Sequence, residues 1–137
     1  MRRPPLVARL AGINKYSEYP AHRPEGDISA IKLETFLKDE FTEGNKDVIQ
    51  IISDTRKVGI IDALELLRSK FDRNNTILFF FSGYGGRTTA GTSIICPADI
   101  GRSDKSKGIT DQELGQLFDS ISRTRGNNIV SNPILYS

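Results

Sequence analysis

TILFFFSGYGG, residues 76–86, is the stretch of this sequence that decides the fold. Its apolar and aromatic run shows no polar alternation and stops abruptly at the glycines. Such a run is typical of a strand that is buried on both faces of a sheet. Open α/β folds place their chemistry at the carboxyl edge of the sheet, so the residues that follow the run are the first candidates for a functional site. Tyr84 lies there between two glycines, and its identity decides most of the functional interpretation.

The rest of the chain alternates strand and helix patterns around this run. The strand segments are apolar, and each helical segment carries apolar residues at helical spacing. This βαβα order predicts an α/β fold with a mostly parallel sheet and helices on both faces. Asp27 and Thr55 are expected to cap helices, and Thr110 and Glu113 fit a capping box. The predicted strands are 6–13, 48–53, 76–81 and a fourth from 128, with a short extended piece at 92–96, and the predicted helices are 27–41, 55–71 and 110–121.

Length, charge and cysteine content narrow the classes of function. The 137 residues form one domain at most, which is long enough for a real core. Because 19 lysines and arginines nearly balance 17 acidic residues, we expect neither nucleic-acid nor membrane binding. We recognise no membrane helix or signal peptide, so we expect a cytoplasmic protein. The single cysteine, Cys96, excludes an internal disulfide and a multi-cysteine metal site.

Several short motifs stand in a fixed order along the chain. Two flank the predicted parallel strands: AGINKY at residues 11–16 and FFFSGYG at residues 79–85. The others are Asp27 after Gly26, Thr55-Arg56, ICPAD at 95–99, ITD at 109–111 with Glu113-Leu114, and GNNIV at 126–130. Together they resemble, in the same order, the motifs of the large-subunit half of the caspase-like cysteine peptidases, and they are most similar to those of the metacaspases and their fungal relatives.

The resemblance implies a caspase-like three-layer α/β/α sandwich, C-terminally truncated, over residues 6–130, with residues 1–5 and 131–137 as flexible tails. It also implies membership of a family of cysteine endopeptidases. In that family the His of S-G-H-G pairs with a Cys after the fourth strand, and backbone N–H groups hold the oxyanion. Carried over to this chain, Gly85 is the candidate oxyanion donor, and Asp27 and Asp99 are candidate substrate-binding carboxylates. For the two aspartates, a helix cap and a turn are the alternative roles.

Two departures from the family pattern predict that the chain is catalytically inactive. Tyr84 occupies the position of the catalytic His, and a phenol, whose pKa is ordinarily about 10, is never cationic and cannot pair with a thiolate. The family's D-x-C-H-S-G should follow the fourth strand, but the chain reads VSNPILYS from residue 130. Pro133 predicts that the strand ends here. Without a nucleophile there is no covalent catalysis, so we expect a pseudo-enzyme or a truncated fragment that Tyr84→His would not reactivate.

The sequence leaves two other classes of function open. The fourth strand would form an open sheet edge, through which the chain could pair with a full-length relative or with itself as a decoy or regulator. A nucleotide-binding α/β domain is the other alternative, although the glycines after the third strand lack the lysine of a phosphate-binding loop.

Other chemistry-bearing residues are assigned structural roles. Cys96 and His22 are the one Cys–His pair of the chain, but the cysteine pattern is that of a small buried residue and His22 lies in a polar segment. Residues 86–93 lack the acidic cluster of calcium-dependent metacaspases, so we expect no metal site and no cofactor. Tyr84 itself is expected to pack against a neighbouring loop with its hydroxyl hydrogen-bonded.

Overall fold

The computed structural model describes residues 5–16, 19, 25–41, 48–67, 75–88, 90–101, 107–125 and 128–136. For residues 124, 125 and 128–136 it describes the backbone alone.

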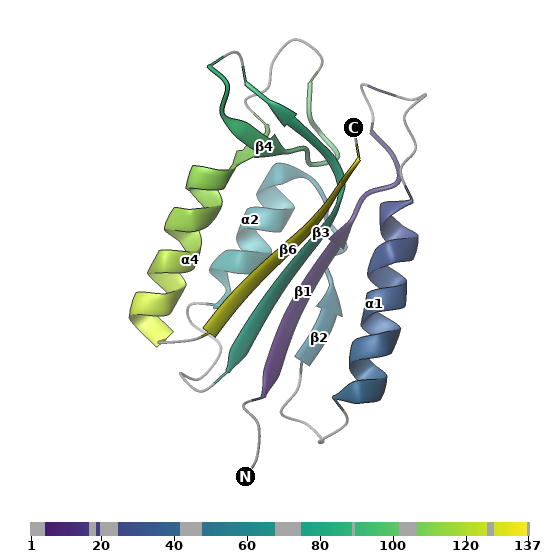
Figure 1. The fold of residues 1–137 in the computed structure, drawn as a ribbon, viewed down its shortest axis with the longest axis vertical. Coiled ribbons are helices and arrows are strands. Elements are labelled where there is room, and N and C mark those ends of the chain that lie inside the picture. Colours follow the sequence, from purple (N-terminus) through teal and green to yellow (C-terminus); the bar gives the residue numbers. More distant parts are fainter. Residues whose placement is uncertain are drawn as a thin grey trace.

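The described residues form one sheet of six strands, and its middle is parallel (Figure 1). Four strands run in the order β2–β1–β3–β6, and every neighbouring pair among them is parallel. β3 continues past the end of β1 and pairs there with β4 in the antiparallel direction, and β4 pairs with β5. The bounds are Leu6–Gly12 for β1, Val48–Ile51 for β2, Thr76–Arg87 for β3, Ser93–Ile95 for β4, Ile109–Thr110 for β5 and Asn128–Tyr136 for β6. The predicted α/β class and the mostly parallel sheet are confirmed.

Helices cover both faces of this sheet, as expected. Helix α1, Gly26–Glu40, lies on one face, whereas α2, Lys57–Glu65, and α4, Asp111–Arg125, lie on the other (Figure 1). Within the described ranges, no helix is both long and apolar enough to cross a membrane.

The aromatic run of β3 supplies the core on both faces. Phe80 belongs to the cluster under α1, together with Leu37, because alternate residues of a strand point to opposite faces. Phe79 and Phe81 belong to the larger cluster under α2 and α4. All three rings are almost wholly buried, and burying a side chain of this size contributes roughly 1.5–3 kcal/mol to stability.

Helix starts agree with the sequence in one case out of three. The capping box of α4 is confirmed: the Glu113 N–H donates to Thr110 Oγ1 (2.9 Å), and the Thr110 N–H donates to the Glu113 carboxylate (3.2 Å). Thr55 does not cap α2, because Arg56 precedes that helix and makes no side-chain cap bond. Helix α1 begins at Gly26, so Asp27 lies inside its first turn rather than before it.

The predicted end of the fourth strand at Val130 is wrong. β6 continues to Tyr136 and pairs with β3 along its whole length, so the expected flexible tail from residue 131 is strand as far as Tyr136. The reason lies in the register. Ser82 is paired with Ile134 but turns its oxygen to Ile13 on the other side, so Ile134 is the residue that faces β3. The nitrogen of Pro133 therefore faces away from the ladder, where a proline costs no hydrogen bond.

Two glycines set α1 against the carboxyl edge of the sheet. A methyl group added to Gly26 would overlap the Ser82 carbonyl oxygen and the backbone of Ile13, and one added to Gly12 would overlap the Gly26 carbonyl. The start of α1 thus lies backbone to backbone against the ends of β1 and β3. This contact holds Asp27 close to the strand ends that carry the candidate site.

Replacing Gly26 by alanine should lower the free energy of unfolding by about 1–3 kcal/mol, because the backbone has to move to admit the methyl group. Gly115→Ala is the matched control, since nothing lies within 4 Å of the methyl group it adds on the exposed side of α4. That change should raise stability by roughly 0.5–1 kcal/mol. Denaturant titration followed by circular dichroism measures both. Equal effects at the two glycines would contradict the close contact.

Candidate functional site

A tyrosine hydroxyl joins three segments at the carboxyl edge of the sheet. Tyr16 follows β1 and is 1% exposed. Its hydroxyl accepts a hydrogen bond from the Tyr84 N–H (2.8 Å) and donates one to the Cys96 carbonyl oxygen (2.7 Å). Because Tyr84 lies in β3 and Cys96 directly follows β4, this one side chain connects the end of β1 to the junction of the two strands.

The Tyr16 hydroxyl replaces one of the two hydrogen bonds that would otherwise join Tyr84 and Cys96 directly. Gly85 is paired with Ile95, so Tyr84 lies opposite Cys96. Opposed residues of a hydrogen-bonded antiparallel pair exchange two N–H···O bonds. Here the Cys96 N–H donates directly to the Tyr84 oxygen (2.8 Å), whereas the return bond passes through Tyr16. The Tyr84 amide is therefore already hydrogen-bonded inside the fold.

Burial keeps the bridging Tyr16 hydroxyl in its neutral, protonated form. Desolvation of the Tyr16 phenol raises its pKa well above the ordinary value, although the hydrogen bond from the Tyr84 N–H acts in the opposite direction. The rings of Tyr16 and Tyr84 pack at a centroid distance of 5.3 Å and an interplanar angle of 58°, a tilted arrangement that aromatic pairs favour. The expected packing of Tyr84 against a neighbouring loop is confirmed, and Tyr16 in the loop after β1 is its partner.

Gly85, the candidate oxyanion donor, turns its backbone away from β4. Ser82 and Tyr84 accept hydrogen bonds from Ile13 and Cys96, so these two residues face β1 and β4. Because backbone groups alternate in direction along a strand, the Gly85 N–H points to the opposite side of β3. β6 runs on that side as far as Tyr136, the register partner of Tyr84.

The two candidate substrate-binding aspartates are not brought together. The Asp27 carboxylate accepts the Ile28 N–H (2.8 Å) in the first turn of α1. The Asp99 carboxylate accepts the Lys57 N–H (3.0 Å) at the start of α2, on the other face of the sheet. Each carboxylate thus stabilises the positive end of a helix. Asp99 lies in a turn after Pro97, which is the alternative role that the sequence left for it, whereas Asp27 lies inside the first turn of α1 and is not its cap.

Lys57 is a site residue that the sequence interpretation missed. Its Nζ donates to the Gly108 carbonyl oxygen (3.0 Å) and forms an ion pair with Glu113 (3.2 Å), while Asp99 holds its backbone N–H. These contacts connect α2 to the start of α4 and to the segment after β4. No local signal in the sequence marks Lys57, because its partners lie more than 40 residues away.

The remaining polar groups at this edge do not form a second catalytic arrangement. Cys96 is buried, as expected, with 7% of its surface exposed. His22, its only possible imidazole partner, lies outside the described residues. The Ser82 hydroxyl is buried and has no hydrogen-bond partner in the described structure. In the same ranges, no three His, Cys, Asp or Glu side chains come close enough together to hold a metal ion.

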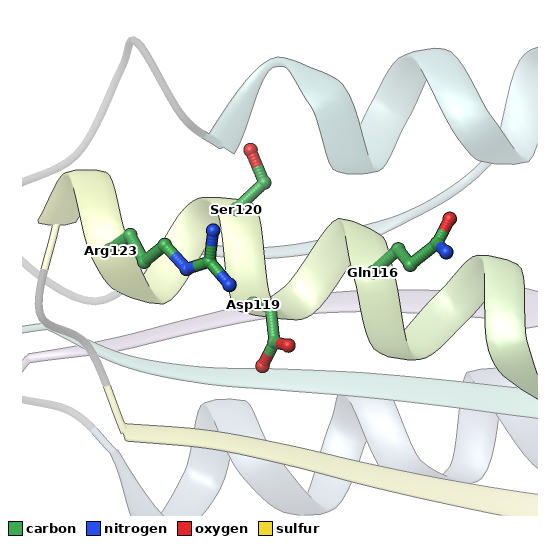
Figure 2. Close-up of a pocket in the computed structure, with 4 residues that line it drawn as sticks. All are labelled: Gln116, Asp119, Ser120 and Arg123. Atoms are coloured by element: carbon green, nitrogen blue, oxygen red, sulfur yellow. The ribbon is translucent and has the colours of Figure 1, made fainter.

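Two hollows lie away from Tyr84. One, of about 300 Å³, is on α4 and is lined by Gln116, Asp119, Ser120 and Arg123 (Figure 2). There Asp119 and Ser120 leave the helix in opposite directions, with Ser120 on the side of α2. The other, of about 370 Å³, lies between β2 and α2 over the buried Arg9. Neither contains a residue of the candidate site.

Comparison with known proteins identifies the fold alone. No family model matches the sequence, and no curated protein matches it. The fold recurs, since 56 chains of known structure match it. One of them, protein GSU0716 from Geobacter sulfurreducens, is similar with a TM-score of 0.67 and 15% sequence identity over 95% of this chain. The match covers 50% of that protein, so this chain spans half of its length.

Removing the bridging hydroxyl should destabilise the protein. Tyr16→Phe leaves the Tyr84 N–H and the Cys96 oxygen without their partner, so we expect a loss of about 1–3 kcal/mol in the free energy of unfolding. Tyr19→Phe is the control, because its half-buried hydroxyl lies 3.4 Å from the Gly101 oxygen and should contribute less.

The pH dependence separates the hydroxyl from simple packing. The pKa of Tyr16 is higher in the folded than in the unfolded chain, where tyrosine ionises near pH 10. Its contribution is therefore complete below about pH 10 and is lost as the pH rises further, by up to about 1.4 kcal/mol per pH unit. The stability difference between the native chain and Tyr16→Phe should shrink in alkali. A difference that stays constant from pH 8 to pH 11 would contradict a buried, hydrogen-bonded phenol.

Proposed function

We propose that this chain is a non-catalytic member of the caspase-like cysteine peptidases. The observation that carries the proposal is the bridge from Tyr16 to Tyr84 and Cys96 at the carboxyl end of β3. In the family that the sequence resembles, the catalytic histidine occupies the position of Tyr84. In this chain that position is Tyr84, whose backbone N–H donates a hydrogen bond to the Tyr16 hydroxyl inside the fold.

Convergence of separate motifs supports the family assignment. Tyr16 belongs to AGINKY, Tyr84 to FFFSGYG and Cys96 to ICPAD, and these segments are separated by as many as 80 residues in the chain. Hydrogen bonds nonetheless join all three in one place. The β2–β1–β3–β6 sheet with an antiparallel extension after β3 is compatible with the sandwich that the resemblance implies.

The chemistry of the described residues supports inactivity. A reactive cysteine needs an accessible, electropositive setting that favours the thiolate, and Cys96 is instead buried among apolar side chains. A phenol at position 84 cannot act as the cation that stabilises a thiolate. Among the described residues, the carboxyl end of β3 therefore has a cysteine, Cys96, but no accessible thiol and no imidazole beside it.

The chain should not cleave peptides. We expect no turnover of fluorogenic peptides with Arg, Lys or Asp before the scissile bond, for the native chain and for Tyr84→His alike, because no nucleophile is restored. Cys96→Ser is the control for trace activity. Turnover that thiol alkylation blocks and that Cys96→Ser abolishes would overturn the proposal.

A second candidate is an interaction module that pairs along β6. In the described part of the chain β6 pairs with β3 alone, over nine residues, so its other edge can accept a strand from a full-length relative or a second copy. The backbone nitrogen of Pro133 faces this open edge and supplies no donor to it, while the N–H groups of Ser131 and Leu135 face the same edge on either side of Pro133.

Substitutions on β6 test this pairing. Ser131→Pro should abolish edge binding, since it removes a second outward-facing donor, and Pro133→Ala should strengthen it. Light scattering against protein concentration is the measurement. A chain whose association is unchanged by both substitutions does not use this edge.

The nucleotide-binding alternative gains no support, because Gly85 and Gly86 lie in a strand paired with β4 and not in a loop before a helix.

A further inference from the structure

The hollow between β2 and α2 lies over a buried arginine that the proposed function does not use. Its volume is about 370 Å³, which is at the lower end of the range of small-molecule sites. Arg9 lies in the middle of β1 and is 7% exposed. It points to the α2 side of the sheet, as Val7 and Ala11 do, because alternate residues of a strand share a face. Arginine is rarely buried, and a guanidinium beside a hollow is a recognition group for anions.

The guanidinium of Arg9 is held in place by the backbone of β1. Its Nη1 donates a hydrogen bond to the Ala8 carbonyl oxygen (3.1 Å). A guanidinium has five N–H donors and takes a carboxylate through two parallel N–H···O bonds, so this bond is compatible with an anion bound beside it. Burial lowers the pKa of Arg9 because it removes water from the charged group, yet an arginine stays charged at neutral pH. Arg9 therefore presents a positive charge suited to a carboxylate.

One stripe of residues on α2 forms a wall of the hollow. Gly59, Asp62, Ala63 and Leu66 all line it, and their spacing of three and four residues places them on one side of the helix. The Asp62 carboxylate is exposed and makes no hydrogen bond or ion pair within the described ranges. Ala63 and the half-exposed Leu66 add an apolar surface next to it. The wall thus combines one negative charge with an aliphatic patch.

The charge of the second acid in the hollow is compensated. The Asp54 carboxylate accepts two hydrogen bonds from the Arg56 guanidinium, of 3.0 and 2.8 Å, and they lower the pKa of Asp54. Gly59 lets this residue lie against α2, because a methyl group on Gly59 would overlap Asp54. Among the described residues that line the hollow, Arg9 and Asp62 are therefore the cation and the anion that a ligand would meet.

We propose that this hollow binds a free α-amino acid with an aliphatic side chain. The carboxylate of the ligand pairs with Arg9, its ammonium group pairs with Asp62, and its side chain lies against Ala63 and Leu66. An amino acid carries both charges on one small molecule, so it complements both groups at once. Because the site is small and open, the expected Kd is on the order of 0.1–1 mM.

The lining favours a zwitterion over a simple anion or a simple amine. A phosphate group carries only negative charge, which Asp62 would repel, and an amine without a carboxylate would lie beside the positive charge of Arg9. The hollow contains none of the residues on which the peptidase assignment or the pairing along β6 rests. A failure of this proposal would therefore leave both of those unchanged.

Titration of the isotopically labelled full chain with L-leucine, followed by NMR, tests the site. The backbone amides of Gln50 and Ala63, which line the hollow, should shift, while that of Gln116 on α4 should not. Two analogues of leucine each lack one charged group: isocaproate has no ammonium group, and isopentylamine has no carboxylate. Each should bind about tenfold more weakly than leucine or worse, because it loses one of the two charge-assisted interactions.

Substitutions separate recognition of the ammonium group from that of the carboxylate. Asp62→Asn should weaken leucine binding by about tenfold and should not weaken isocaproate binding. Asp119→Asn is the matched control, because Asp119 is an exposed acid on α4 outside this hollow, and it should change neither. Arg9→Lys, verified for folding by circular dichroism, should weaken leucine and isocaproate alike, because an ammonium group cannot form the two parallel bonds of a guanidinium.

Several results would overturn the proposal. Equal affinities for leucine and isocaproate would do so, as would equal losses of leucine binding in Asp62→Asn and Asp119→Asn. An absence of amide shifts at about 10 mM leucine would also overturn it, since that is roughly ten times the weakest expected Kd. Inorganic phosphate that binds as tightly as leucine would show a general anion site in its place.

Discussion

The hydroxyl of Tyr16 is the contact on which the carboxyl edge of this domain depends. It replaces one rung of the β3–β4 ladder and fixes the loop after β1 to both strands at once. Its presence also explains Gly83, because a methyl group there would lie 2.7 Å from the Tyr16 oxygen and 2.9 Å from the ring of Phe81. The position of the Tyr16 hydroxyl therefore requires a residue without a side chain at position 83 of β3.

This arrangement uses for structure the groups that a catalytic site would need for chemistry. The Tyr84 amide donates to Tyr16, the Cys96 thiol is buried, and the Asp27 and Asp99 carboxylates hold the starts of two helices on opposite faces. A reactive cysteine, in contrast, needs an accessible thiol. In the described residues these groups therefore stabilise the fold, which is what the proposal of a non-catalytic domain requires.

The sequence predicted correctly those features that depend on interactions between residues close together in the chain. The aromatic run at 76–81 forms the first half of β3, and Thr110 and Glu113 form their capping box, because each depends on residues close in the chain. The predicted end of this strand at the glycines is wrong, because β3 continues to Arg87 by pairing with β4. Long-range contacts were not predictable in this way. The bridge of Tyr16 joins residues 68 and 80 positions away, and Asp99 reaches Lys57 across 42. Pro133 gave a wrong predicted end for β6, because a proline interrupts a strand only where its nitrogen faces the neighbouring strand. The register that decides this could not be read from the sequence.

The most direct test of this account is residue-specific amide hydrogen exchange at Tyr84. If the Tyr16 hydroxyl accepts this N–H inside the fold, the amide should be protected in the native chain about as well as that of Cys96. It should then lose protection selectively in Tyr16→Phe, while the amide of Phe79 stays protected. A Tyr84 amide that exchanges at the rate of an unfolded chain, or one indifferent to the loss of the hydroxyl, would contradict the account.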